Sequence, residues 1–89
     1  MTSPSKGGWT CYLLECSDGT LYCGITNDLA ARIDAHNAGA GAKYTRGRTP
    51  VKLVYAEQCA DKSHALKREM GIKALSRAGK LALAVAEGK

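Results

Sequence analysis

The chain has 89 residues, a net charge of +5 and a hydrophobic content of 45%. This length fits one small domain, and the apolar fraction excludes a disordered chain. No apolar run approaches the roughly 18 residues that a membrane span needs, and residues 1–8 lack the apolar middle of a signal peptide. We therefore expect a cytoplasmic protein with no membrane partner, a flexible leader at 1–8 and one domain at 9–87. The positive charge favours a polyanionic partner, nucleic acid first.

Residues 9–25 predict two short strands joined by a turn at 17–19, where the Asp-Gly pair is a turn signal. A two-residue loop would put Tyr12 and Tyr22 on opposite faces of the hairpin. A three-residue loop that ends on Gly19 pairs residues whose numbers sum to 36, and then both tyrosines share the less apolar face. This second register sorts the side chains more cleanly, so we expect it.

Residues 27–38 predict a helix that Thr26 or Asn27 can cap and that Gly39 ends. Three charged or titratable residues spaced four apart form one stripe on it: Asp28, Arg32 and His36. From the residues alone, this stripe is either a surface ion pair beside a solvated histidine or part of a functional site.

The composition of residues 39–50 predicts a loop. Three cations and one tyrosine lie within six positions of it: Lys43, Tyr44, Arg46 and Arg48. Such a cluster is either a solvated basic loop or a phosphate clamp with one stacking platform for single-stranded nucleic acid.

Residues 51–59 alternate as a third strand, with Val51, Leu53 and Tyr55 on one side. A second helix follows from Asp61 to about Leu75. Its expected apolar arc contains Ala65, Leu66, Met70 and Ile72.

Glu69 falls in the middle of that arc. A buried, unpaired carboxylate costs several kcal/mol, so Glu69 needs a partner. The partner is either Lys73, one turn further on, or a metal ion.

Ser76 can cap a third helix, on which Gly79 has no explanation from the sequence. Its expected inner face carries Ala78, Leu81, Ala82 and Val85.

The four cysteines, Cys11, Cys16, Cys23 and Cys59, have no Cys-x-x-Cys spacing, so we do not expect a zinc site. The order strand-strand-helix-strand-helix-helix predicts an α+β fold, with a three-stranded antiparallel sheet flanked by helices.

Two short motifs carry a resemblance to a known family. Thr10-Cys11-Tyr12 and Tyr22-Cys23-Gly24 resemble the two halves of the GIY-YIG nuclease signature, with Thr-Cys in place of Gly-Ile and Cys in place of the second Ile. The stretch 36–55, which includes Gly-Ala-Lys-Tyr-Thr-Arg and Pro-Val-Lys-Leu-Val-Tyr, is similar to the small single-domain branch of that superfamily. The resemblance extends from about Trp9 to Lys80.

The resemblance implies a GIY-YIG domain that hydrolyses phosphodiester bonds with one divalent ion, Mg²⁺ or Mn²⁺. It implies catalytic roles for Tyr12, Tyr22, Arg32, His36 and Glu69. Glu69 would be the metal ligand, Arg32 would neutralise charge on the phosphorus, and either Tyr12 or His36 would be the general base.

We expect DNA as the substrate, with low sequence specificity. The basic loop favours single-stranded DNA, and RNA is possible. The alternatives are a nucleic-acid-binding module that has lost the chemistry and a protein-interaction domain whose charge is incidental.

Overall fold

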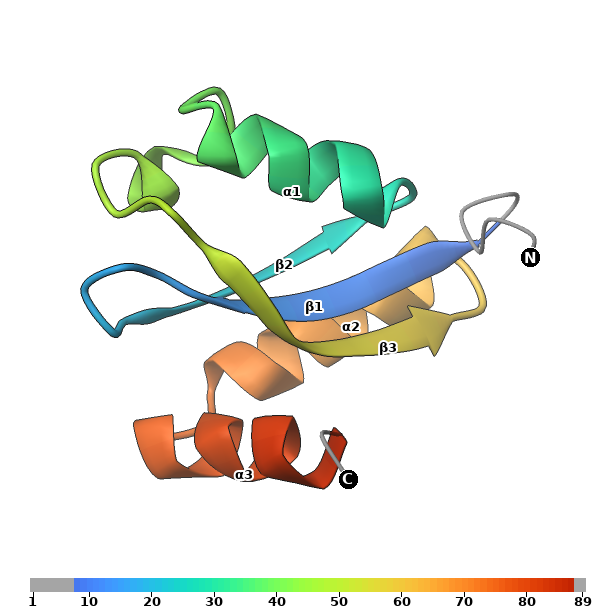
Figure 1. The fold of residues 1–89 in the computed structure, drawn as a ribbon. Helices are drawn as coiled ribbons and strands as arrows, with labels where there is room; N and C mark the ends of the chain where they lie inside the picture. Colours follow the sequence, from blue (N-terminus) through green and yellow to red (C-terminus); the bar gives the residue numbers. More distant parts are fainter. Residues whose placement is uncertain (1–7, 88–89) are drawn as a thin grey trace.

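The computed structural model describes residues 8–87, without the side chains of Tyr44, Ala86 and Glu87. The expected leader at 1–8 therefore lies almost wholly outside the described residues. The elements, drawn in Figure 1, are β1 (Trp9–Glu15), β2 (Leu21–Thr26), α1 (Leu29–Asn37), the 3₁₀ turn η1 (Lys43–Thr45), β3 (Lys52–Cys59), α2 (Lys62–Lys73) and α3 (Arg77–Glu87). Within residues 8–87, no helix has the length and apolarity that crossing a membrane requires.

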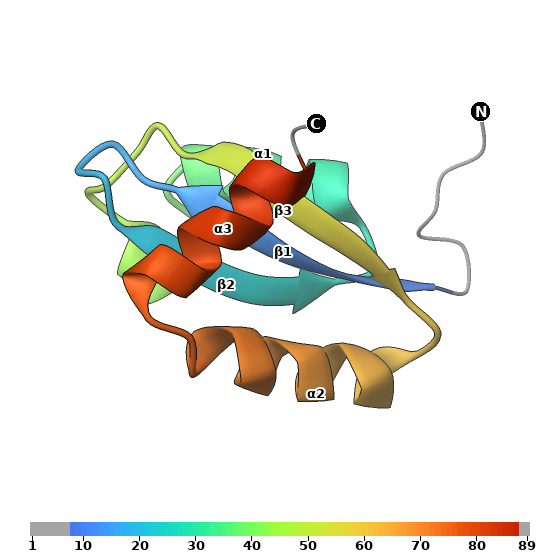
Figure 2. The same ribbon diagram turned by 90° about the horizontal axis from the view of Figure 1, so that it is seen from below.

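The three strands form one antiparallel sheet in the order β2-β1-β3. Helix α1 lies over one face, and α2 and α3 lie under the other, as Figures 1 and 2 show from two directions. This arrangement confirms the predicted α+β fold and its order of elements. It leaves β2 and β3 as the two edge strands.

The hairpin has the predicted three-residue loop. Cα partners across β1 and β2 have numbers that sum to 36, as in Tyr12↔Gly24 and Leu14↔Tyr22. Gly19 has a φ of 85°, which a residue with a side chain adopts only with strain. Tyr12 and Tyr22 consequently project from the same face.

The predicted alternation of the third strand is wrong at its centre. The register of β1 and β3 shifts between Leu13, which pairs with Tyr55, and Leu14, which pairs with Leu53. A bulge of one extra residue moves the rest of the strand to the opposite face. Val51 therefore packs on the face of Tyr12, whereas Tyr55 packs on the other.

Helix α1 begins two residues later than predicted. Its N-cap is Asp28, whose side chain accepts a hydrogen bond from the backbone N–H of Ala31, and the Oγ1 of Thr26 accepts one from the N–H of Asp28. At the other end, Gly39 has a φ of 80°, so it ends the helix as expected.

The inward faces of α2 and α3 differ from the predicted ones. On α2, Ala65 and Ile72 are buried, but Leu66 is 42% exposed and Met70 71%. On α3, the four residues expected inside are exposed, and Leu83 packs against the core instead. The structure explains the glycine at position 79, because a Cβ on Gly79 would lie only 3.2 Å from the Cβ of Leu75.

Two apolar clusters lie on the two faces of the sheet. The cluster under α2 and α3 includes Cys11, Leu13, Cys23 and Cys59, and the cluster under α1 includes Tyr12, Leu14, Cys16 and Val51. All four cysteines are buried free thiols, so each serves as a small apolar core residue. The cysteines of both signature motifs thus face away from the tyrosines.

Candidate active site

A chain of hydrogen bonds runs through the core beneath α1. The hydroxyl of Tyr12 lies 3.1 Å from Nε2 of His36, and Nδ1 of the same ring lies 2.8 Å from Oγ1 of Thr45. The Thr45 hydroxyl donates its hydrogen to the carbonyl of Ala42 at 2.9 Å. It must therefore accept from Nδ1–H, so the neutral imidazole accepts the Tyr12 proton at Nε2.

Burial sets the acid–base properties of this chain. Tyr12 is 1% exposed and His36 0%. Burial raises the pKa of Tyr12 to about 12, although the nearby guanidinium of Arg32 acts in the opposite direction. Burial, and then the positive charge of Arg32, lower the pKa of His36. At neutral pH, Tyr12 is thus a phenol and His36 a neutral acceptor.

Tyr22 and Arg32 complete the cluster. The ring centroid of Tyr22 lies 6.4 Å from that of Tyr12 and 5.3 Å from that of His36. Tyr22 is half-buried, so it is the tyrosine of the pair that reaches solvent. The structure therefore brings together four of the five predicted catalytic residues, and of the two alternatives for the helix stripe it excludes a solvated histidine, because His36 is buried.

Two glycines make this close packing possible. A Cβ on Gly24 would lie 2.6 Å from the Tyr12 hydroxyl oxygen, and a Cβ on Gly41 would overlap the ring of His36. Gly24 was part of the recognised motif. Gly41 and Thr45 were missed, because only the path of the loop after α1 brings them to the histidine, and no spacing rule predicts that path.

Glu69 lies on α2, which packs against the other face of the sheet. Its side chain is 17% exposed and its carboxylate lies 3.3 Å from the Nζ of Lys73. Ala65 and Ile72 of the same helix pack in one cluster with Cys11 and Cys23, so α2 lies on the side of those buried thiols rather than on that of the tyrosines. Glu69 thus belongs to a helix that packs on the opposite face of the sheet from the other four residues.

One carboxylate is compatible with the expected ion but does not form a cage. Among the described residues, no group of three His, Cys, Asp or Glu side chains could hold a metal. Mg²⁺ keeps several waters and needs only one or two carboxylates, so Glu69 fits such an ion once it releases Lys73.

The predicted nucleic-acid-binding loop docks on the tip of the hairpin. The guanidinium of Arg48 donates to Asp18 at 2.9 Å, and the Arg48 carbonyl accepts from the N–H of Ser17 at 2.7 Å. Lys43 and Arg46 are exposed. The side chain of Tyr44 lies outside the described residues. Lys43 and Arg46 are therefore the loop cations best placed for phosphates.

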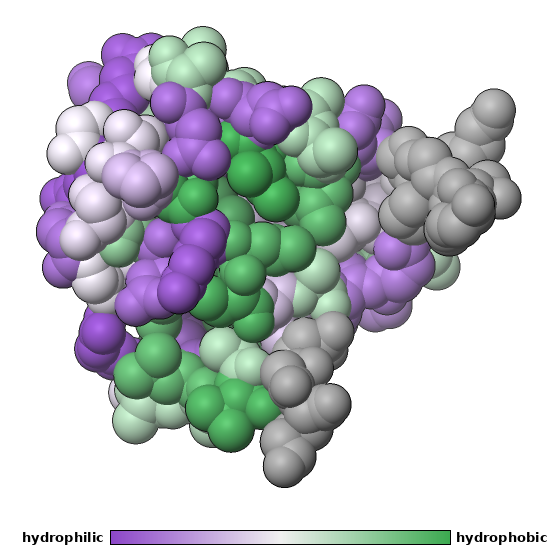
Figure 3. Space-filling view, in the orientation of Figure 1, coloured by the Kyte–Doolittle hydropathy of each residue, from purple (hydrophilic) through white to green (hydrophobic). Residues whose placement is uncertain are grey.

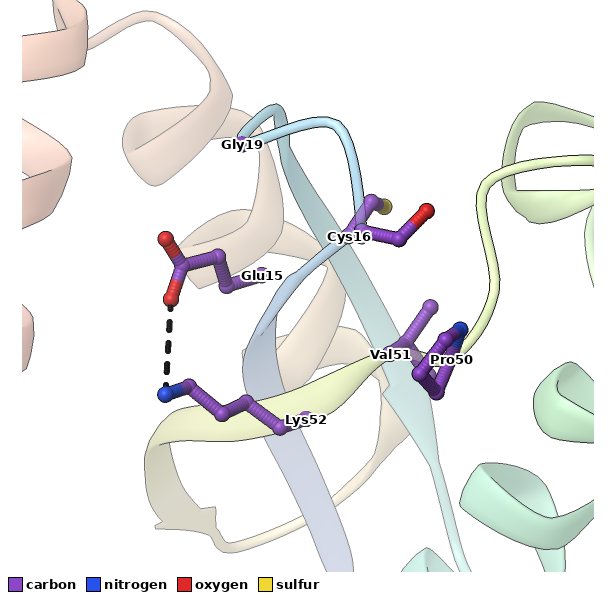
Figure 4. Close-up of a pocket in the computed structure, with 7 residues that line it drawn as sticks. Glu15, Cys16, Gly19, Pro50, Val51 and Lys52 are labelled. Carbon is purple, nitrogen blue, oxygen red and sulfur yellow. Dashed lines mark ion pairs between the residues drawn. The ribbon is translucent and has the colours of Figure 1, made fainter.

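A separate hollow of about 310 Å³ lies where the hairpin turn meets the start of β3, as Figure 4 shows. An ion pair joins Glu15 and Lys52 at 3.8 Å on its wall. The hollow is lined by Glu15, Cys16, Ser17, Gly19, Pro50, Val51 and Lys52. None of the predicted catalytic residues lines it, so it is not part of the candidate active site.

Comparison with protein families gives a match over most of the chain. A family model described as the GIY-YIG catalytic domain matches residues 8–82. A UPF0213 protein of Halobacterium salinarum is 60% identical over 72 residues, which cover 81% of this chain and 94% of that protein.

Two solved structures are also similar. The solution structure of a UPF0213 protein from Bacillus halodurans matches with a TM-score of 0.59 and 43% identity, and covers 91% of this chain and 86% of that one. A protein from E. faecalis matches with a TM-score of 0.59 and 39% identity over 84% of this chain and 80% of that one. The names of these relatives state no activity.

Proposed function

This chain belongs to the GIY-YIG catalytic domain family, and from that premise we propose that it is a divalent-metal-dependent endonuclease that cuts DNA with low sequence specificity. The domain implies nuclease-type activity on a nucleic acid. The metal dependence, the choice of DNA, the preference for single strands and a cytoplasmic location are the finer parts of the proposal.

The observation that carries the proposal is the chain of hydrogen bonds from Tyr12 through His36 to Thr45. A phenol with a pKa of about 12 is a poor base by itself, because ionising it at pH 7 costs about 7 kcal/mol. The tautomer of His36 removes this obstacle, since its Nε2 already accepts the Tyr12 proton. This supports His36 as the final proton acceptor.

In the proposed step, the attacking water gives a proton to the Tyr12 oxygen while Tyr12 gives its own proton to Nε2 of His36. The water oxygen bonds to phosphorus as the bond from phosphorus to the 3′ oxygen breaks, and the leaving 3′ oxygen takes a proton from solvent water. The imidazolium keeps its Nδ1–H bond to Thr45, which holds the ring in place. Arg32, beside the Tyr12 hydroxyl, can neutralise charge on the phosphoryl oxygens. Tyr22, nearer to solvent, orients the water.

Glu69 would hold the ion from the other side of β2. When bound there, Mg²⁺ or Mn²⁺ supplies electrostatic stabilisation of the leaving 3′ oxygen. Since Tyr12 and His36 are buried, both water and substrate must approach over the edge strand β2, from which the half-buried Tyr22 reaches solvent.

The rival function is a nucleic-acid-binding module without catalysis. The burial and raised pKa of Tyr12 favour it, because a fully bonded buried network can be structural. A digestion panel separates the two functions. It compares single-stranded, duplex and flapped DNA and RNA, each with Mg²⁺, with Mn²⁺ or with a chelator. We expect cleavage of single-stranded DNA that the chelator abolishes; binding without cleavage on every substrate would favour the rival.

A further inference from the structure

The excess positive charge of the chain lies in residues 62–80. Six of the thirteen Lys and Arg residues are there with a single acid, Glu69, while the other seven cations are matched by the other seven acids. The basic loop at 43–48 thus belongs to a part of the chain without net charge. A polyanion is attracted chiefly by α2 and the start of α3.

Two cations of this segment are committed to carboxylates. Arg68 donates two hydrogen bonds to Glu57, and Lys73 pairs with Glu69. Arg77 and Lys80, in contrast, form no ion pair among residues 8–87. Their charges are therefore available to a ligand.

Arg77 and Lys80 line a hollow of about 210 Å³ with Thr20 and Leu21. The Nη1 of Arg77 donates to the carbonyl of Gly19 at 2.6 Å, which fixes the guanidinium at the hairpin tip. The one acid of that tip, Asp18, is engaged with Arg48 and Thr20. The hollow thus presents two cations and no unpaired carboxylate.

This hollow adjoins the candidate active site across an edge strand. Leu21 precedes Tyr22 in β2, and successive side chains of a strand point to opposite faces. The basic loop and the start of α3 lie on either side of the hairpin turn, at the same end of the sheet (Figures 1 and 2). Figure 3 shows that the loop and hairpin-turn part of this end is mostly hydrophilic, whereas the apolar surface gathers toward the middle and over α3.

We propose that the hollow formed by Thr20, Leu21, Arg77 and Lys80 is a second phosphate-binding position, occupied by a nucleic-acid strand that crosses the free edge of β2 to reach the tyrosines. The inference rests on the proposed function and adds the path of the substrate. A path from one face of the sheet to the other bends sharply. Duplex DNA, with a persistence length of about 150 base pairs, resists such a bend, whereas a single strand follows it at little cost, so a single strand is the favoured occupant.

The test measures binding of labelled oligothymidylates of about 4 to 16 nucleotides as a function of salt, in chelator. The test variant is R77Q/K80Q. The control variant K52Q, matched to K80Q, removes one charge from an exposed position outside both the hollow and residues 62–80. For the longer strands, we expect the slope of log K against log salt to lose about 0.7 per phosphate contact removed in the test variant, and to stay at the wild-type value in the control.

Arg77 also holds the hairpin tip, so K80Q alone, which keeps that bond, is measured beside the double variant. The slope of log K against log salt should change in K80Q by about half as much as in R77Q/K80Q. Equal slopes for wild type, K80Q and R77Q/K80Q would overturn the inference and leave the proposed function standing. A wild type that binds no oligonucleotide would overturn both, and binding to phosphatidylglycerol vesicles instead would assign the charge to a membrane surface.

Discussion

Gly24 is the residue on which the arrangement of the tyrosines depends. Its position opposite Tyr12 in the register, and the 2.6 Å that would separate a Cβ from the Tyr12 oxygen, explain why a glycine ends the second motif. The two motif cysteines, Cys11 and Cys23, have Sγ atoms 3.9 Å apart in the opposite cluster. Their difference from the family signature therefore alters core packing under α2 and leaves the tyrosine face unchanged.

Replacing Tyr12 by Phe tests the proton path. The variant lacks the hydroxyl that donates to His36, so cleavage should fall by about 10² or more. Stability should fall by about 1–3 kcal/mol, because a buried acceptor loses its partner.

The matched control for Tyr12→Phe is Tyr55→Phe. Tyr55 donates to Glu57 at 2.5 Å on the other face of the sheet, so this change should also cost stability but leave cleavage intact. Nuclease rates and denaturant unfolding of both variants make the comparison. Equal losses of cleavage would show that the Tyr12 effect is only a folding effect.

The lowered pKa of His36 predicts a pH dependence of stability. In the unfolded chain this histidine titrates near its ordinary value of about 6.5, above its value in the fold. The unfolded state therefore binds the proton first as pH falls, and acidification from about pH 7.5 through 6.5 should lower the free energy of unfolding.

Denaturant unfolding between about pH 5.5 and 8 measures this slope in wild type and His36→Gln. The window avoids the carboxylates Asp18 and Glu57, whose pKa values are lowered by their hydrogen bonds and which titrate in more acidic solution. The slope should flatten in the variant. The same slope in both proteins would mean that His36 is not the group that titrates.

At the scale of elements, local chemistry predicted the hairpin and failed on the helix faces. The turn at 17–19 fixes the register because only Gly19 accepts the positive φ. In α2, apolar residues are too scattered to define one stripe. Hydrophobicity assigned Leu66 and Met70 to the core, whereas the small Ala65 allows the close contact with the sheet. The bulge in β3 has no sequence signal.

Two glycines without close neighbours give opposite predictions for the same substitution. Gly19→Ala places a side chain at a φ of 85° and should destabilise the fold by about 1–2 kcal/mol. Gly71→Ala lies inside α2 and should stabilise it by about 0.5–1 kcal/mol. At both positions a Cβ meets nothing within 4 Å, so backbone conformation alone decides the sign. Thermal unfolding checks it, and shifts of the same sign would contradict the turn geometry.

At the scale of the whole molecule, the candidate site is divided between the two faces of a three-stranded sheet. The sequence supported convergence of Tyr12, Tyr22, Arg32 and His36 through strand register and helix spacing. It could not place Glu69 relative to them, because that depends on which face receives α2. Strand β2 is the one element shared by both halves, since α2 packs beneath it and Tyr22 projects above it.

Glu69→Gln tests whether these halves work together. If Glu69 only pairs with Lys73, the variant should lose no more than about 0.5 kcal/mol and keep its activity. If Glu69 holds the metal, stability should stay or rise, because an acid with one surface partner becomes a neutral amide. Cleavage with Mg²⁺ or Mn²⁺ should then fall by several orders of magnitude, while DNA binding in chelator should persist.

Glu57→Gln is the control for this change, since Glu57 is a second partly buried acid on the α2 side of the sheet. It accepts hydrogen bonds from Arg68 and Tyr55, and the bonds from Arg68 are the main cause of its lowered pKa. Its loss should lower stability without lowering cleavage. The two acids therefore predict opposite patterns: Glu57 stabilises the fold and Glu69 supports turnover. A Glu69→Gln protein that cleaves at the wild-type rate would remove the acid from the mechanism and favour the binding module.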